Sequence, residues 1–391
     1  MATQATPKIP LVRAGRDLRV DMFRGLALWM IFVNHTPGNI VGDFTLRKVS
    51  LSDATEIFVL LAGYAAGLSY GRMLEREGWL RTGTRIVERI FTLYVAHIFL
   101  FVVFTAQVGF SAAALDQAAY FDELALDPFT QEPYRALLEA LLLRYQPAFL
   151  DVLPLYIVVL ALFALAVPLI RRLPLLIGAS VLMYVLARGV GIAPPSWTGD
   201  AWFFNPFAWQ LLFAIGIWLG RADTATLSRW FGWNPWVAAA LMALLLGNAF
   251  GMNLSRAGML FGITAPEWLA GWYATIDKSG LHPARLASVL IMVWLAAHWV
   301  KPQAAWLNGY VASLFALLGQ QGLPVFCAGI FLSFLGRVTI EVSEGWHAQL
   351  LVNLGGLLAL VGIAALVAWH EGGTRRKPDA LPAANKVAKL S

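Results

Sequence analysis

Long apolar runs constrain this chain more than any other feature of its sequence. Several runs approach or exceed the roughly 20 apolar residues that a helix needs to cross a bilayer, among them Ala54–Leu74, Ile86–Val108 and Leu150–Ile170. A soluble domain needs polar cover, and such domains contain about 25% charged residues. This chain contains only 13%. The sequence therefore predicts an all-α, polytopic integral membrane protein.

About ten transmembrane helices can be placed along the chain. The candidate spans are Met22–Val41, Ala54–Leu74, Ile86–Val108, Leu150–Ile170, Leu173–Val190, Phe207–Gly220, Pro235–Met252, Leu286–Val300, Asn308–Leu335 and His347–Trp369. The ninth is interrupted at residues 320–324, so two half-helices are an alternative there, and two full spans would raise the count to eleven. Residues 21–370 would form one transmembrane domain, between an N-terminal segment of residues 1–20 and a polar tail of residues 371–391.

The basic residues predict the orientation, because Lys and Arg are enriched in cytoplasmic loops. With the N-terminus inside and ten spans, most of the 29 basic residues fall on the cytoplasmic side. The long loop Gly109–Phe149 then lies outside, and it is acidic. Both termini are expected in the cytoplasm. The net charge of +6 does not indicate nucleic-acid binding, because the basic residues cluster at the ends of apolar runs.

Ionisable residues within the first two spans are the candidates for catalysis, since such groups are costly in a membrane and face the protein interior or water. His35 lies 13 residues after Met22, which is about 20 Å along a helix and places it in the outer half of the membrane. Glu56 lies near the same level. A histidine held by a carboxylate can remove a proton from a hydroxyl group. The alternative is a pair that merely satisfies two buried polar groups.

A basic cluster is expected on the opposite, cytoplasmic side. Arg85 and Arg89 are four residues apart and share one helix face. With Arg24 they can form a basic mouth for phosphate groups, which arginine binds through two hydrogen bonds. The alternative is the ordinary positive charge of cytoplasmic helix ends. Arg89 is followed directly by apolar residues, which favours a ligand role for it.

Aromatic and amide residues gather in the predicted outer loops. Most of the aromatic residues fit the belt found at any membrane interface, although aromatic faces can also stack on sugar rings. The motif Phe204–Gln210 holds more amides than a belt needs, so Asn205 and Trp209 are candidate acceptor-binding residues. Asp151, at the outer end of the fourth span, is a third. The remaining histidines lack ligand spacing, and no metal site is predicted.

Several separated motifs resemble the OpgC family. They are Arg19–Gly25, the Asn34–His35 pair, Asp53–Tyr64, Leu150–Tyr156 and Phe204–Gln210, and the resemblance extends from about Arg16 to Trp369. OpgC proteins belong to the acyltransferase-3 superfamily of transmembrane acyltransferases, in which a first-span histidine acts on the acceptor hydroxyl.

The resemblance assigns roles to residues of this chain. His35 matches the histidine, Glu56 matches the acidic residue of the second-span motif, and Arg85 or Arg89 matches the arginine that begins the third span. The usual Ser-Gly end of the second-span motif is Ala62–Gly63 here.

The resemblance also implies a reaction. OpgC proteins transfer succinyl groups, with succinyl-CoA as the expected cytoplasmic donor, to osmoregulated periplasmic glucans. No bound cofactor is then expected: acyl-CoA is a co-substrate, the glucan is the acceptor, and lipid of the bacterial inner membrane surrounds the chain. The identity of the acyl group is left open, with acetyl as the alternative to succinyl. Whether the protein forms a homodimer is also left open. A glycan or anion transporter and a scaffold are the other classes, but a scaffold gains nothing from costly intramembrane groups such as His35.

Overall fold

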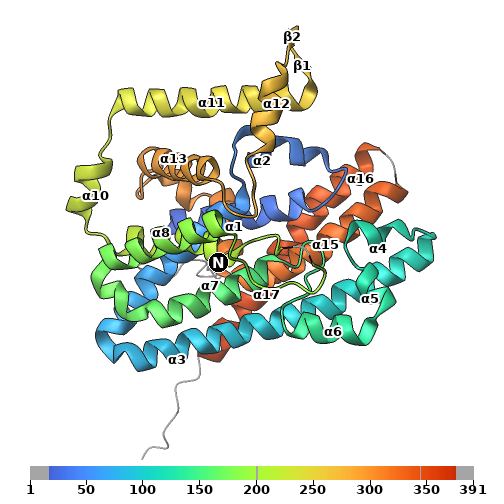
Figure 1. The fold of residues 1–391 in the computed structure, drawn as a ribbon, viewed down its shortest axis with the longest axis horizontal. Helices are drawn as coiled ribbons and strands as arrows, with labels where there is room; N and C mark the ends of the chain where they lie inside the picture. The colour runs from blue at the N-terminus through green and yellow to red at the C-terminus, as the bar shows by residue number, and fades with distance from the viewer. Residues whose placement is uncertain (1–16, 200, 344, 376–391) are drawn as a thin grey trace, which may run out of the picture.

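The computed structural model describes residues 17–199, 201–343 and 345–375, and almost all of its elements are helices (Figure 1). The expected terminal segments, residues 1–20 and 371–391, lie mostly outside the described residues. Strands β1 (Met259–Leu260) and β2 (Ile263–Thr264) pair antiparallel in a short hairpin. The predicted helical fold is therefore confirmed over the described part of the chain.

The longer helices account for most of the described residues. They are α1 (Leu18–Asn34), α3 (Ala54–Leu115), α7 (Val152–Ala166), α8 (Leu173–Val190), α9 (Pro206–Arg221), α11 (Pro235–Ala257), α13 (Pro283–Trp299), α14 (Tyr310–Gln320), α15 (Gly322–Val342) and α17 (Gly356–Arg375). The short helices are η1 (Ile40–Phe44), α2 (Leu46–Val49), α4 (Ala119–Glu123), α5 (Asp127–Gln131), α6 (Pro133–Leu141), η2 (Val167–Arg172), α10 (Thr224–Phe231), α12 (Glu267–Ala274), η3 (Ala305–Asn308), α16 (Trp346–Leu350) and η4 (Leu351–Gly355).

Five helical stretches among the described residues are long and apolar enough to cross a membrane. They are Ala54–Leu115, Val152–Val190, Pro235–Ala257, Gly322–Val342 and Trp346–Gly372. The first two have 62 and 39 residues, and each contains two of the predicted spans. A membrane protein is therefore confirmed, whereas the count of ten spans stays a prediction.

Two of the predicted spans meet inside α3. Gly78 has φ of +79° within this helix, and the chain is helical on both sides of it. A positive φ is readily adopted only by glycine, which lacks a Cβ. Gly78 therefore divides α3 into a segment that begins near the predicted outer side and a second segment that contains Arg85, Arg89 and His97.

The predicted ninth span is broken where the sequence suggested. Helix α14 ends at Gln320, and α15 begins at Gly322. Between them, Gln321 has φ −105° and ψ +43°, outside the helical region. In this structure the span therefore consists of two helices.

Glycines allow two pairs of helices to approach closely, as small residues do in membrane bundles. Between α1 and α14, a Cβ on Gly25 would lie only 1.8 Å from the carbonyl oxygen of Phe315. Between α3 and α9, a Cβ on Gly63 would lie 2.1 Å from the carbonyl oxygen of Phe213. These contacts fix α1 and the first half of α3, whose neighbouring ends carry His35 and Glu56.

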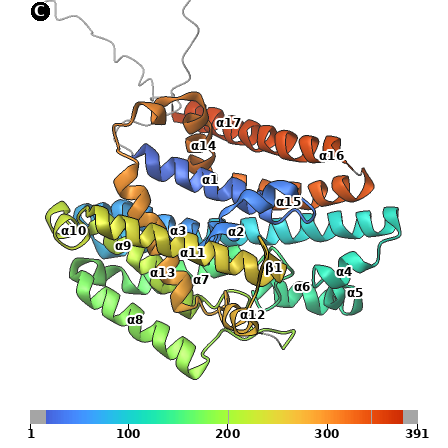
Figure 2. The same cartoon turned by 90° about the horizontal axis from the view of Figure 1, so that it is seen from above.

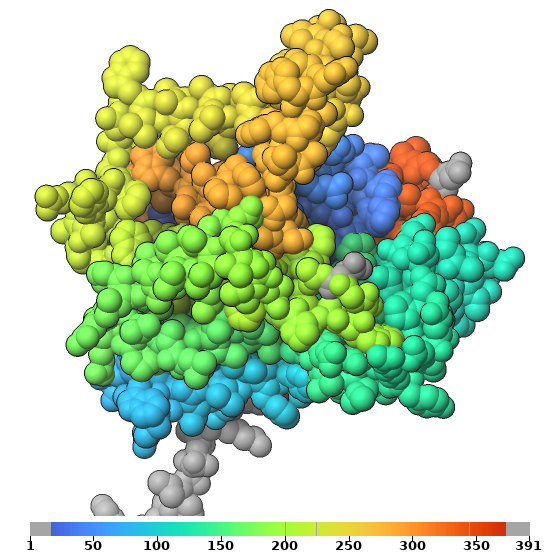
Figure 3. All heavy atoms as spheres, in the orientation of Figure 1, coloured from blue at the N-terminus to red at the C-terminus, as the bar shows by residue number. Residues whose placement is uncertain are grey.

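Helix α11 lies along the edge of the bundle (Figure 1), and seen from above it crosses in front of the other helices (Figure 2). Helix α12 and the hairpin project beyond the other elements (Figure 3). Helix α11 contacts α2, α12 and α13. Near α13, the rings of Trp233 and Trp294 stack with centroids 5.8 Å apart. The loop between α12 and α13 returns from this edge to the end of the bundle where α1 ends and α3 begins.

Candidate active site

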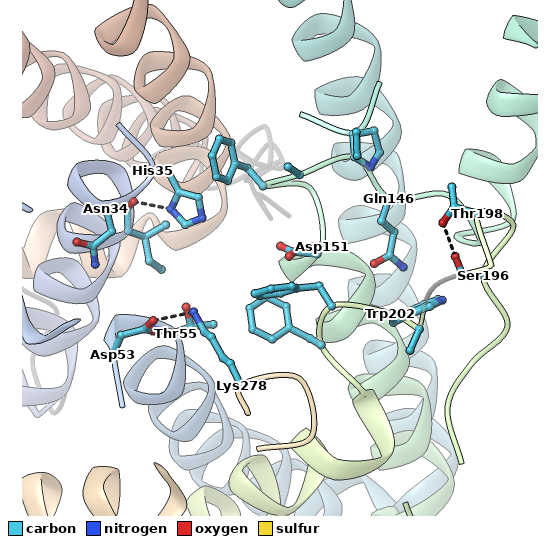
Figure 4. Close-up of a pocket in the computed structure, with 18 of the residues that line it drawn as sticks. Asn34, His35, Asp53, Thr55, Gln146, Asp151, Ser196, Thr198, Trp202 and Lys278 are labelled. Carbon is cyan, nitrogen blue, oxygen red and sulfur yellow. Dashed lines mark hydrogen bonds and ion pairs between the residues drawn. The ribbon is translucent and has the colours of Figure 1, made fainter. Parts of the chain in front are cut away.

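A cavity of about 450 Å³ lies at one end of the bundle (Figure 4). Its wall combines the end of α1, Arg47 of α2, the first turn of α3, Asp151 just before α7, residues of the loop segments 144–149, 196–198 and 201–204, and one side chain from the loop between α12 and α13. The titratable side chains in the wall are His35, Arg47, Asp53, Arg144, Asp151 and Lys278. The orientation predicted from the basic residues would make this the outer end.

His35 stands at the C-terminus of α1, where its backbone leaves the helix. Its Nδ1 lies 2.7 Å from the carbonyl oxygen of Ile31, one helical turn earlier. A carbonyl oxygen can only accept a hydrogen bond, so Nδ1 carries a proton, and in the neutral imidazole Nε2 keeps its lone pair. The ring of Phe149 packs edge-on against the imidazole, with centroids 4.6 Å apart. In its neutral form, His35 therefore presents Nε2 as the nitrogen that can accept a proton.

Glu56 does not make the expected contact with the imidazole. It is fully buried, and its Oε1 lies 2.5 Å from Nη2 of Arg285 on α13. Its Oε2 accepts a hydrogen bond from the backbone N–H of Asp53 at 3.0 Å. In return, Asp53 accepts from the N-terminal backbone of α3 and completes a capping box. The backbone of α1, and not Glu56, fixes the tautomer of His35.

Lys278 comes from the loop between α12 and α13 and reaches the cavity wall. Its Nζ lies 2.6 Å from Oδ2 of Asp53. It also lies over the rings of Phe203 and Phe204, at 5.8 and 5.3 Å from their centroids. Figure 4 shows Lys278 and Asp53 below His35, with Asp151 facing the same space. A histidine, a lysine and two carboxylates therefore meet in one cavity.

Of the three predicted acceptor-binding residues, only Asp151 lines the cavity. Asn205 caps α9 by accepting a hydrogen bond from the backbone N–H of Phe207. Trp209 is fully buried, and its Nε1 donates to the carbonyl oxygens of Lys278 and Ser279, at 3.2 and 3.1 Å. The backbone N–H of Asn205 donates to the carbonyl oxygen of Ser279 at 3.0 Å, so Asn205 and Trp209 both support the segment that carries Lys278.

The three predicted phosphate-binding arginines lie away from this cavity. Arg85 is exposed and pairs with Glu88 at 2.9 Å on the same helix. Arg89 is half-buried, and both Arg89 and Arg24 lie close enough to Tyr156 on α7 for their charges to act on its hydroxyl group. The structure thus places Arg24 and Arg89 near the same tyrosine of α7 and leaves Arg85 on the surface.

Sequence reasoning missed four cations in or near this cavity: Arg47, Arg144, Lys278 and Arg285. Lys278 and Arg285 lie more than 220 residues after the carboxylates that they contact, so no local spacing connects them. Arg47 lies in the connection between the first two spans, where a single basic residue resembles any loop charge. Asp53 belongs to the second-span motif. Its position directly before α3, where an acidic residue can cap a helix, was the sequence signal that could have identified it.

The fold and the cavity define a helical, polytopic membrane protein with a polar, histidine-containing site at one end of its bundle. A family model described as OpgC protein matches residues 16–372, and the chain belongs to the OpgC family. No curated protein and no solved structure gives a significant match. The family indicates a role in the modification of osmoregulated periplasmic glucans, as an acyltransferase.

Proposed function

We propose that this protein moves a succinyl group from cytoplasmic succinyl-CoA to hydroxyl groups of osmoregulated periplasmic glucans, across the bacterial inner membrane with both termini in the cytoplasm. Family membership supports a glucan as the acceptor and acyl transfer as the reaction. The observation that carries the chemistry is the hydrogen bond from His35 Nδ1 to the Ile31 carbonyl. It prepares Nε2 as a general base inside a cavity large enough for part of a sugar.

In the proposed reaction a glucan hydroxyl enters the cavity from outside and hydrogen bonds to Nε2 of His35. The imidazole takes the proton as the hydroxyl oxygen attacks the thioester carbonyl carbon. The carbon–sulfur bond then breaks, CoA leaves as a thiolate that receives the proton from His35, and an ester remains on the glucan. Direct transfer needs no covalent intermediate on the enzyme.

Neighbouring groups complete the proposed site. The side chain of Thr45 donates to Oδ1 of Asn34 at 2.7 Å, which orients the Asn34 amide beside the cavity. Its Nδ2 makes no hydrogen bond to the described residues and can stabilise the negative charge that develops on the thioester oxygen. Glu56 acts as a positioning residue, because it holds Arg285 and the first turn of α3. Asp151 is placed to accept a hydrogen bond from the sugar.

The donor would reach His35 from the other side of the membrane. Arg24 and His35 are on the same helix, eleven residues apart, which corresponds to about 16 Å. A pantetheine arm of similar length can span that distance while its phosphates remain near Arg24 and Arg89. Arg89 is favoured over Arg85 for this role, because Arg85 already pairs with Glu88 at the surface.

Mass spectrometry of periplasmic glucans tests the proposal directly. We expect glucans from cells that make this protein to carry succinyl esters, and glucans from cells lacking it to be unmodified. Expression of a His35→Ala variant should leave the glucans unmodified as well. Identical glucan masses with and without the protein would contradict the proposed function, and an acetyl mass increment would correct the acyl group.

A further inference from the structure

A second, smaller cavity of about 170 Å³ adjoins the first and shares Arg47 and Asp53 with it. Its wall comes from the connection between α1 and α3, the end of α11, and the α12–α13 region. Three arginines line it: Arg47, Arg256 and Arg285. Three guanidinium groups around one small cavity place a large positive charge there, so the negative charge that balances it has to be identified.

Hydrogen bonds between α11 and α2 build this wall. Nδ2 of Asn253 donates to the carbonyl oxygen of Lys48 at 2.7 Å, and Nη1 of Arg256 donates to that of Arg47 at 3.3 Å. These bonds hold the end of α11 on α2 and bring the two arginines together. Their like charges lie close enough to oppose each other.

Three acidic groups nearby already have cationic partners. Asp53 pairs with Lys278, and Glu56 pairs with Arg285. On the segment that carries Arg47, Asp43 pairs with Lys48 at 2.9 Å. Among the described residues, no carboxylate lies within ion-pair distance of Arg47 or Arg256, although Asp43 lies close enough to Arg47 for their charges to interact. Two neighbouring positive charges without a direct ion-pair partner are unfavourable and suit an anionic ligand.

We propose that Arg47 and Arg256 form a specificity site for a carboxylate carried by one of the two reacting molecules. This inference rests on the proposed function. Arg47 lines the cavity of His35 as well as the smaller one, so a group bound there can belong to a molecule that reacts at His35. Guanidinium groups bind carboxylates through paired, charge-assisted hydrogen bonds.

Two sources supply this chemistry. One is the free carboxylate of the transferred succinyl group, which lies three carbon–carbon bonds, or about 4 Å, from the reacting carbonyl carbon. The other is an acidic substituent on the glucan. In either case the arginine pair would select a charged reactant over a neutral one of the same shape.

Steady-state kinetics of the purified full-length protein separate the sources. In the donor arm, succinyl-CoA is compared with butyryl-CoA, which has a methyl group in place of the carboxylate. In the acceptor arm, a carboxymethylated glucan is compared with the neutral glucan. The variants are Arg47→Gln, Arg256→Gln and Arg47→Lys. Lys48→Gln is the matched control, because it removes a neighbouring charge that lines neither cavity.

We expect each glutamine variant to lower the preference for the charged reactant, measured as a ratio of kcat/KM values, by about tenfold or more in one arm. Arg47→Lys should retain part of the preference, and Lys48→Gln should retain all of it. Unchanged ratios in both arms would overturn the arginine site while transfer itself continued. Absence of transfer by the wild-type protein from every donor would instead overturn the proposed function, and this inference with it.

Discussion

Arg285 and Glu56 form a buried ion pair between α13 and the first turn of α3, with Nη2 of the arginine 2.5 Å from Oε1 of the glutamate. The two residues are 229 positions apart in the chain. Glu56 also accepts a hydrogen bond from the backbone of Asp53. One carboxylate therefore fixes both the start of α3 and the position of α13, next to the cavity that contains His35.

Removal of one partner should destabilise the protein strongly. A Glu56→Ala substitution removes the nearest partner of the largely buried Arg285 and leaves it, among the described residues, only Asp53 at 3.9 Å. Loss of one member of a buried pair costs about 3–5 kcal/mol, and the remaining contact with Asp53 favours the lower end of that range. We expect a clearly lower thermal midpoint in detergent. Arg85→Ala is the control, because it breaks the exposed pair with Glu88, for which about 0–1 kcal/mol is expected. Equal midpoints for the two variants would show that the pair does not hold the site together.

The contact between α3 and α9 gives a second prediction. A Gly63→Ala substitution would place a methyl group against the Phe213 backbone, and overpacking of this kind costs about 1–3 kcal/mol. Gly83→Ala is the matched control in the same helix, because a Cβ there meets nothing within 4 Å and alanine is the better helix former. We expect a lower thermal midpoint for the first variant and an unchanged or higher one for the second. The reverse order would contradict the close packing of these helices.

Local features of the sequence were enough to predict the helical membrane fold and the break at Gln321. Both depend on neighbouring residues: the length of apolar runs in the first case, and a Gln-Gln-Gly-Leu-Pro sequence in the second. Residue counting also placed His35 and Asp151 at the same end of the bundle, where both line one cavity, but it paired His35 with Glu56 instead of Asp53. The position of a residue along a helix axis can be obtained by counting residues, because each residue adds about 1.5 Å.

Side-chain partners were less predictable, because they depend on how distant segments pack. Two carboxylates, Glu56 and Asp53, pair with cations that follow them by more than 220 residues. The tautomer of His35 is fixed by a backbone carbonyl, which carries no sequence signal. The amide-rich motif around Asn205 suggested sugar contacts, but in the structure its amide caps α9.

The two candidate arginines of α3 should differ in their effect on the donor. We expect Arg89→Ala to raise the KM for succinyl-CoA by about tenfold, because a charge-assisted contact to phosphate is lost. Arg85→Ala should change it less than about twofold, since this side chain is exposed and paired at the surface. Initial rates at varied donor concentration measure both. An effect of Arg85→Ala as large as that of Arg89→Ala would contradict the assignment.

The most direct test of the account is succinyl transfer by a purified His35→Ala variant whose thermal midpoint matches that of the wild-type protein. General base catalysis contributes about 10²- to 10⁴-fold to rate, so we predict that kcat falls by at least that lower factor. Transfer by this folded variant at the wild-type rate would show that His35 is not the base and would contradict the account.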